Sequence, residues 1–334
     1  MLVSNSGPDA TSRAAFKALM LQLPGISTVE GPSSIEPMVS ADPPLLKTAP
    51  LVEGTVMRAI RVPDYSRLTA SGFGAFLDGA QRVQVMGHHF GIPIVYATVS
   101  AAIRVRVNRR LATWGHQRPR VERKFLLPLR YLPAFGGDTA LANSLASGAI
   151  VDTSKADRNG EYPIPHPTVL LDRAVRAVDE LREELEHSLA EAWCTRAEAP
   201  LFIDGGISGN PRVASSSCAV GVVKSHRTLH VEGDALRIVL GLEQGERSPV
   251  FRVAPRSRSS VMSWYLRVRS AKGHDPLWGL VRVEVAEAER PTERADEISR
   301  WVLAEMSPLS LPDGRWDKMA YGIRDCEEFL RAIS

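Results

Sequence analysis

The pattern of apolar and polar positions predicts strands first, then a long helix, then further strands and two terminal helices. Between Phe73 and Val107, two stretches rich in β-branched and apolar residues flank a Gly-containing break, which indicates an antiparallel hairpin or meander. From Thr168 to Trp193, apolar residues recur at three- and four-residue spacing, the pattern of one buried helical face. Pro167 and Thr168 supply a start signal for this helix.

The rest of the chain divides into short apolar segments and two peripheral stretches. Strands are predicted within 201–206, 217–226, 260–270 and 276–285, and helices over 12–23, 292–306 and 323–333. Residues 31–44 are rich in Pro and Ser, which indicates a linker, so residues 1–70 are interpreted as a peripheral N-terminal arm and 71–334 as the main domain. A helix that crosses back over paired strands to a further strand gives an α/β fold, with a mixed sheet flanked by helices.

Composition narrows the class of protein. Of 334 residues, 44% are hydrophobic and 24% are charged, as in ordinary globular domains. No apolar run reaches the roughly 18 residues of a membrane span, and the N-terminus lacks a signal-peptide pattern, so we expect a cytoplasmic protein without a membrane partner. Cys194, Cys218 and Cys326 are widely spaced, which gives no support for a disulfide framework or a zinc site and indicates reduced thiols.

Two hydrophobic segments, AFLDG and LFIDG, each end in a carboxylate, Asp78 and Asp204. We expect both side chains to emerge where a buried strand reaches the edge of the sheet. Carboxylate oxygens from different strands are suitable ligands for Mg²⁺ or Mn²⁺, and a pair of ions about 4 Å apart can support phosphodiester hydrolysis. The alternative is that each Asp-Gly pair only forms a turn.

The predicted long helix and a later strand offer further carboxylates. Glu186 follows the apolar stripe of the helix and is the first choice for a third metal ligand, with Glu183, one turn earlier, as the alternative. Glu284 is isolated in an otherwise apolar and basic strand, where it needs a metal ion or a salt bridge to a neighbouring Arg.

Basic residues are concentrated in two segments although the net charge is only +3. The first segment contains Arg104 and Arg106. The second segment spans 247–274, has no acidic residue, and contains Arg252 and Arg267 near Trp264 and Tyr265. This mixture suits phosphate contact and base stacking, and the alternative is an ordinary soluble surface. Lys224 and His226 follow an apolar strand on one face, where we expect phosphate contact more than proton transfer by the histidine.

The order of FLDG, LREELE, FIDGG, GVVKSHR, GERSPVFRV, SWYLRV and WGLVRVEV resembles the bacterial branch of the NurA nucleases, from about Phe73 to the C-terminus. The resemblance implies a ribonuclease-H-like, PIWI-like fold, a homodimer, Mn²⁺ or Mg²⁺ as cofactor, and DNA degradation with a HerA-type hexameric ATPase in end resection, repair or defence. It places metal ligands at Asp78, Glu186 and Asp204. The C-terminal tyrosine of the family falls on Tyr321, but the histidine that many members carry downstream is absent here.

The resulting hypothesis is metal-dependent hydrolysis of DNA, in which Lys224 and nearby Arg residues stabilise negative charge. The chain has no phosphate-binding loop of the Gly-x-x-x-x-Gly-Lys-Ser/Thr type, so ATP would be used by the partner ATPase. Two alternatives stay open: a non-catalytic DNA-binding adaptor of such a motor, and an RNA-directed nuclease, since the fold alone does not choose the sugar.

Overall fold

The computed structural model describes residues 10–22, 26–28, 44–64, 71–108, 110–132, 149–157, 159–196, 199–254, 258–306 and 318–334. Most of the predicted linker at 31–44, and the segment 307–317 between the two terminal helices, lie outside these residues.

The described strands form one large mixed sheet and a small two-stranded one. The large sheet has 13 strands, in the order β3-β12-β14-β15-β10-β9-β4-β5-β7-β8, with β1 on β4, β6 on β5 and β13 on β14. Its strands are β1 (Ile26–Thr28), β3 (Ile60–Arg61), β4 (Ala75–His89), β5 (Ile92–Val107), β6 (Arg110–Thr113), β7 (Arg120–Leu127), β8 (Ile150–Asp152), β9 (Leu201–Asp204), β10 (Ala219–Val223), β12 (Glu246–Arg247), β13 (Phe251–Val253), β14 (Val261–Arg267) and β15 (Leu280–Val285). The small sheet pairs β2 (Leu45–Leu46) with β11 (Thr228–Leu229).

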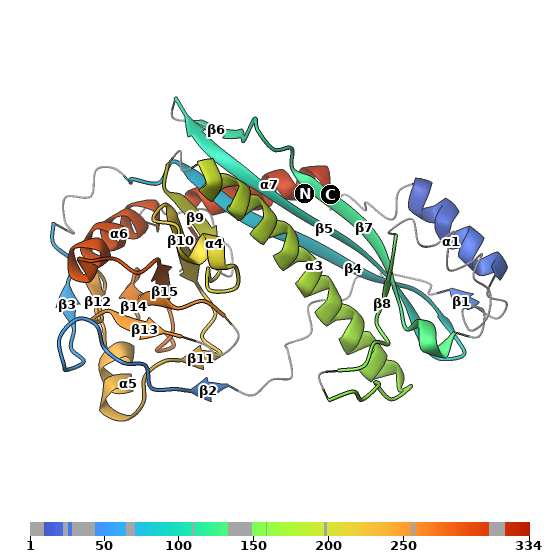
Figure 1. The fold of residues 1–334 in the computed structure, drawn as a ribbon, viewed down its shortest axis with the longest axis horizontal. Coiled ribbons are helices and arrows are strands. Elements are labelled where there is room, and N and C mark those ends of the chain that lie inside the picture. Colours follow the sequence, from blue (N-terminus) through green and yellow to red (C-terminus); the bar gives the residue numbers. More distant parts are fainter. Residues whose placement is uncertain are drawn as a thin grey trace.

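The predicted hairpin is confirmed. Strands β4 and β5 pair antiparallel over almost their whole length, and β7 continues the antiparallel order on the far side of β5. The turn between β4 and β5 contains Phe90 and Gly91, both at positive φ. Figure 1 shows β4, β5 and β7 as long strands that lie side by side.

Helix α3 (Pro167–Arg196) confirms the predicted long helix and crosses over the sheet to β9, which runs parallel to β4. It packs on one sheet face with Leu77 and Ile203, whereas the opposite face packs Phe76 and Phe202 together with residues of α6 (Pro291–Met306) and α7 (Tyr321–Ile333). Figure 1 shows α3 in front of β4 and β5, with α7 behind them. The fold is therefore α/β, with a mixed sheet flanked by helices, as predicted.

The other described helices are α1 (Ala10–Gln22), α4 (Pro211–Ala214) and α5 (Gly233–Leu240). Phe16 and Leu19 of α1 pack against Tyr96 and Phe125, so the predicted N-terminal helix covers the far end of the hairpin. None of the helices in the described part of the chain combines the length and the apolar content of a membrane span.

The predicted domain boundary at residue 70 does not coincide with a break in contacts. Strand β3 pairs with β12, and Leu51 forms a β-bridge with Phe251. The carboxylate of Glu53 is buried and accepts hydrogen bonds of 2.6 and 3.0 Å from the guanidinium of Arg247. Residues 44–64 are thus part of the same packed body as the strands that follow.

Candidate metal centre

Asp78 and Asp204 lie on neighbouring parallel strands. β4 and β9 pair through Leu77 and Ile203, and β9 ends one residue later at Asp204. The expectation that Asp78 ends its strand is wrong, because β4 continues to His89. The neighbouring strand β9 stops beside Asp78, whose side chain is itself buried.

Strand alternation places both aspartates on the sheet face that α7 covers. Phe76 and Phe202 belong to the core on this face, and Asp78 and Asp204 come two residues later on their strands. Helix α7 is held there by Gly322, which packs directly on the ring of Phe76.

Helix α7 adds a third carboxylate, that of Glu327. One carboxylate oxygen from each of Asp78, Asp204 and Glu327 lies within 4.8 Å of the other two. This set of hard oxygen donors fits Mg²⁺ or Mn²⁺. The sequence interpretation missed Glu327, although the apolar positions Ile323 and Leu330 place it beside the buried stripe of the C-terminal helix.

The environment of Asp78 opposes a negative charge. Its side chain is buried, and its Oδ1 accepts a 2.8 Å hydrogen bond from the backbone N–H of Gly79. Its Oδ2 is buried without a hydrogen-bond partner among the described residues. Burial and the nearby charge of Asp204 raise the pKa of Asp78 well above its ordinary value, and Lys224 opposes the shift. A bound cation would satisfy the orphaned oxygen and relieve the repulsion.

Lys224 already neutralises part of this cluster. It follows β10, and its Nζ donates a 2.7 Å hydrogen bond to Oδ2 of Asp204. Its backbone carbonyl accepts a 3.3 Å hydrogen bond from Nζ of Lys318. The structure therefore places Lys224 against a carboxylate of the cluster, and its predicted phosphate contact stays a prediction.

Glu186 approaches the aspartates from the other face of the sheet. It is the buried glutamate of the predicted pair, whereas Glu183 is exposed. Its carboxylate pairs with Arg182 on the same helix and fills the space where Gly79 lacks a side chain. Arg182 also donates a 3.1 Å hydrogen bond to Gln81 of β4, which fixes the helix to the strand. Glu186 thus faces the sheet, in agreement with its position next to the apolar stripe of the helix.

Glu186 is not one of the three carboxylates that come within 4.8 Å of one another. Its charge still interacts with that of Asp204. Burial is the largest cause that raises the pKa of Glu186 to about 7, and the pairing with Arg182 opposes the shift. The two acidic groups thus influence each other from opposite sides of the end of β9.

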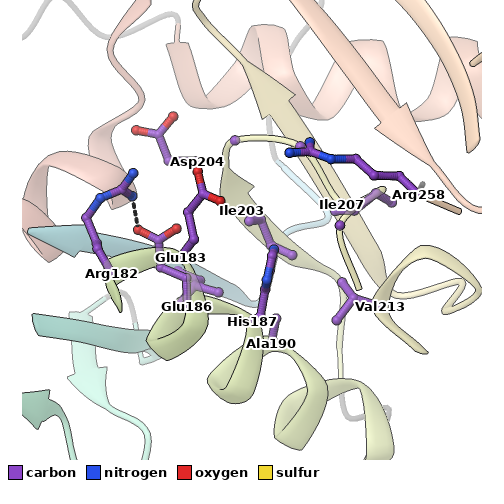
Figure 2. Close-up of a pocket in the computed structure, with 14 residues that line it drawn as sticks. Arg182, Glu183, Glu186, His187, Ala190, Ile203, Asp204, Ile207, Val213 and Arg258 are labelled. Carbon is purple, nitrogen blue, oxygen red and sulfur yellow. Dashed lines mark hydrogen bonds and ion pairs between the residues drawn. The ribbon is translucent and has the colours of Figure 1, made fainter. Parts of the chain in front are cut away.

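A pocket of about 130 Å³ lies between α3 and the loop that follows β9. Figure 2 shows the carboxyl groups of Glu183, Glu186 and Asp204 toward one end of this pocket. The imidazole of His187 and the guanidinium of Arg258 line it further along. One side of Asp204 therefore faces the three-carboxylate cluster, and a recess with both acidic and basic side chains adjoins it.

Glu284 does not belong to the cluster. Its carboxylate is buried, pairs with Arg282 at 2.5 Å and accepts a 2.8 Å hydrogen bond from the backbone N–H of Ile207. The salt-bridge interpretation of Glu284 therefore fits the contacts, in place of the predicted metal ligation. Glu284 holds the loop that follows Asp204, and an added Cβ at Gly206 would lie 2.9 Å from its carboxylate.

The predicted phosphate contact of Arg267 is wrong. Its side chain is fully buried and donates to backbone carbonyl oxygens of Leu240, Leu242, Pro276 and Trp278. Burial lowers the pKa of Arg267 to about 10. Trp264 and Tyr265 are also fully buried, so neither can stack on a base. The error arises because β14 is buried on both faces. The sequence around Arg267 does not reveal the distant backbone carbonyl groups that surround its guanidinium.

The other predicted nucleic-acid contacts are engaged in the fold to different degrees. Arg104 pairs with Asp325 at 2.7 Å, and Arg106 pairs with Glu305 at 2.8 Å, so both connect β5 to the C-terminal helices. Arg252 keeps an exposed side chain and pairs with Glu287 on the surface at 2.9 Å.

His226 and Tyr321 are not part of the three-carboxylate cluster. Nε2 of His226 is 2.7 Å from the carbonyl oxygen of Leu280. Burial lowers the pKa of His226 to about 4, so its ring is neutral at neutral pH and offers no charge to a phosphate. Tyr321 begins α7 and is exposed.

Comparison with known proteins does not identify the chain: no family model matches it, and no curated protein is similar to it in sequence.

Proposed function

We propose that this protein is a metal-dependent DNA nuclease that hydrolyses phosphodiester bonds. The observation that carries the proposal is the meeting of Asp78, Asp204 and Glu327, from two strands and a helix, with their oxygens within 4.8 Å. The buried, unpartnered Oδ2 of Asp78 adds to it, since such an atom needs a ligand. Salt bridges account for Asp204 and Glu327, which pair with Lys224 and Arg331, but Oδ2 of Asp78 has no hydrogen-bond partner among the described residues.

The proposed fold within the α/β class is ribonuclease-H-like. Its support is the chain order: antiparallel strands β4, β5 and β7, then the crossover helix α3, then β9 parallel to β4 and β10 parallel to β9. This is the order that the resemblance to NurA nucleases implies.

In the proposed mechanism, Asp78, Asp204 and Glu327 would hold Mn²⁺ or Mg²⁺. The ion supplies Lewis-acid activation of the phosphate and a more acidic water. Asp204 and Glu186, which both line the pocket, would be the ligands of a second ion there, for which Glu186 would have to leave its ion pair with Arg182. A cation bound at Asp204 would compete with the ammonium group of Lys224, which would then be free to stabilise the negative charge that develops on the phosphate.

The decisive experiment is manganese-dependent cleavage of matched DNA and RNA oligonucleotides by the purified full chain. Asp78→Asn and Asp204→Asn should abolish cleavage while DNA binding is kept. Asp234→Asn is the matched control, because Asp234 is exposed on α5 and pairs only at the surface with Arg237. If the protein cleaves RNA but not DNA, the proposed substrate is RNA and not DNA.

The second candidate is a non-catalytic adaptor that binds DNA and a motor. The ion pair between Lys224 and Asp204 favours it, because a lysine can serve as a built-in counter-ion in a degenerate metal site. If the unaltered protein never cuts DNA, with or without a HerA-type ATPase, the nuclease proposal fails and the adaptor is the better account.

The partners are proposed from the sequence resemblance alone: DNA, a HerA-type hexameric ATPase and a second copy of this chain. Light scattering of the purified protein measures whether it is a dimer. Co-purification with a HerA-type ATPase, and stimulation of cleavage by ATP in its presence, test the motor.

A further inference from the structure

Two of the three cysteines meet at a point that the metal centre does not use. Cys194 lies in the last turn of α3 and is half-buried, and Cys218 is buried immediately before β10. Their Sγ atoms are 3.8 Å apart. The hydroxyl of Ser216 lies 3.1 Å from Sγ of Cys218.

The contact makes the two thiols chemically unequal. A thiol beside a thiolate stabilises it by hydrogen bonding, so the contact with Cys194 lowers the pKa of Cys218 to about 6 and raises the pKa of Cys194. The neighbouring Ser216 and Arg294 act in the same direction on Cys218. The thiolate is the reactive form of cysteine, and the hydroxyl of Ser216, 3.1 Å from Sγ of Cys218, can stabilise a thiolate there, so Cys218 is assigned as the nucleophile.

Cys326 provides an internal comparison. It is fully buried on α7, and its Sγ donates a 3.4 Å hydrogen bond to the carbonyl oxygen of Phe76. Burial raises the pKa of Cys326 well above its ordinary value. A buried thiol of this kind is expected to be inert.

We propose that Cys194 and Cys218 are an oxidation site at which a hydroperoxide forms an intramolecular disulfide. The Cys218 thiolate attacks one peroxide oxygen, the O–O bond breaks, and hydroxide leaves, so that Cys218 becomes a sulfenic acid. The thiol of Cys194 then attacks the Cys218 sulfur, its proton goes to the departing hydroxyl, and water leaves. With hydrogen peroxide, the hydroxide takes up the proton that Cys218 lost on ionisation, so overall two thiols are oxidised to a disulfide and one hydrogen peroxide is reduced to two waters.

The geometry requires little rearrangement. The sulfur atoms need to approach by about 2 Å to reach bonding distance, which side-chain rotation can supply. The bond would fasten the end of α3 to the start of β10, on either side of the segment that contains β9 and Asp204. The expected consequence is a rise of a few degrees in melting temperature, because the segment gains a covalent closure. This proposal is independent of the nuclease proposal.

The test is oxidation of the reduced, purified full chain with hydrogen peroxide, followed by digestion without reductant and mass spectrometry. The expected product is a peptide pair that joins Cys194 to Cys218, lighter by two hydrogen atoms than its reduced parts and separated by dithiothreitol. Cys326→Ser should form the same pair. In Cys194→Ser, dimedone should trap a sulfenic acid on Cys218.

The site is overturned if the oxidised chain contains no Cys194–Cys218 pair, or if Cys326 takes part in disulfides as readily. Rates of iodoacetamide labelling in the unaltered protein give a second readout that needs no variant. Cys218 should react at least tenfold faster than Cys326, and equal rates would contradict the assigned roles.

Discussion

Lys224 and Asp204 form a 2.7 Å ion pair at the point where β9 ends. The same aspartate shares its surroundings with the carboxylates of Asp78 and Glu327, within 4.8 Å. Lys224 pairs with one of these three acidic groups, and Arg331 pairs with Glu327 at 3.5 Å. The carboxylate charge that these two side chains do not neutralise favours a divalent cation. Lys224 and that cation compete for Asp204.

Lys224→Gln should tighten Mn²⁺ binding by about tenfold, because it removes the ammonium group that competes for Asp204. A tenfold change in affinity corresponds to about 1.4 kcal/mol. DNA cleavage should fall in the same variant, since the charge that would stabilise the phosphate is lost. Titration calorimetry and cleavage rates measure the two effects separately. A variant in which metal affinity and cleavage fall together would contradict the competition.

Glu327→Gln should weaken Mn²⁺ binding by at least tenfold, because it replaces one of three charged ligands by a neutral amide. Its neighbour provides the matched control. Glu328 lies on the same helix with an exposed side chain and pairs with Arg324 at 2.9 Å, so Glu328→Gln should bind Mn²⁺ like the unaltered protein. Equal affinities for all three proteins would remove Glu327 from the site.

The sequence predicts local elements better than the site. Alternation and helical spacing locate β4, β5, α3 and the terminal helices, because these signals arise within each segment. Glu327 was missed because its meeting with Asp78 joins segments far apart in the chain. Asp78 was placed at a strand end, since nothing in its own segment reveals that the partner strand stops first. The contacts of Glu284 likewise depend on the distant loop after Asp204.

The pH dependence of stability should carry the signature of Glu186. Its pKa is about 7 in the folded protein against 4.5 ordinarily, so the folded state binds the extra proton between these values. The free energy of unfolding of the metal-free protein should therefore fall as pH rises from 4.5 to 7, by up to about 3 kcal/mol from this group.

Urea unfolding at pH 5 and pH 8 measures this dependence. Glu186→Gln should reduce it, and Asp78, whose pKa is also raised, should supply the dependence that is left. Glu183→Gln is the matched control, because Glu183 is exposed on the same helix and should leave the slope unchanged. The same slope in all three proteins would assign the dependence to another group. Added Mn²⁺ should raise stability most at pH 8, where the carboxylates are ionised.

Arg267 and Arg252 belong to the same basic segment, but Arg267 is buried and Arg252 is exposed, so their variants should have different effects. Arg267→Met keeps the bulk of the side chain but leaves carbonyl oxygens of four residues without their donor. We expect a loss of about 3 kcal/mol or more in the free energy of unfolding, since each buried unsatisfied group costs roughly 1–3 kcal/mol. Arg252→Met should change stability by less than about 1 kcal/mol, because its ion pair with Glu287 is exposed.

If this surface contacts DNA, only Arg252→Met should weaken the binding of a short duplex in low salt while the fold stays intact. Near-normal stability of Arg267→Met together with weakened DNA binding would instead restore the nucleic-acid role predicted for Arg267 from the sequence.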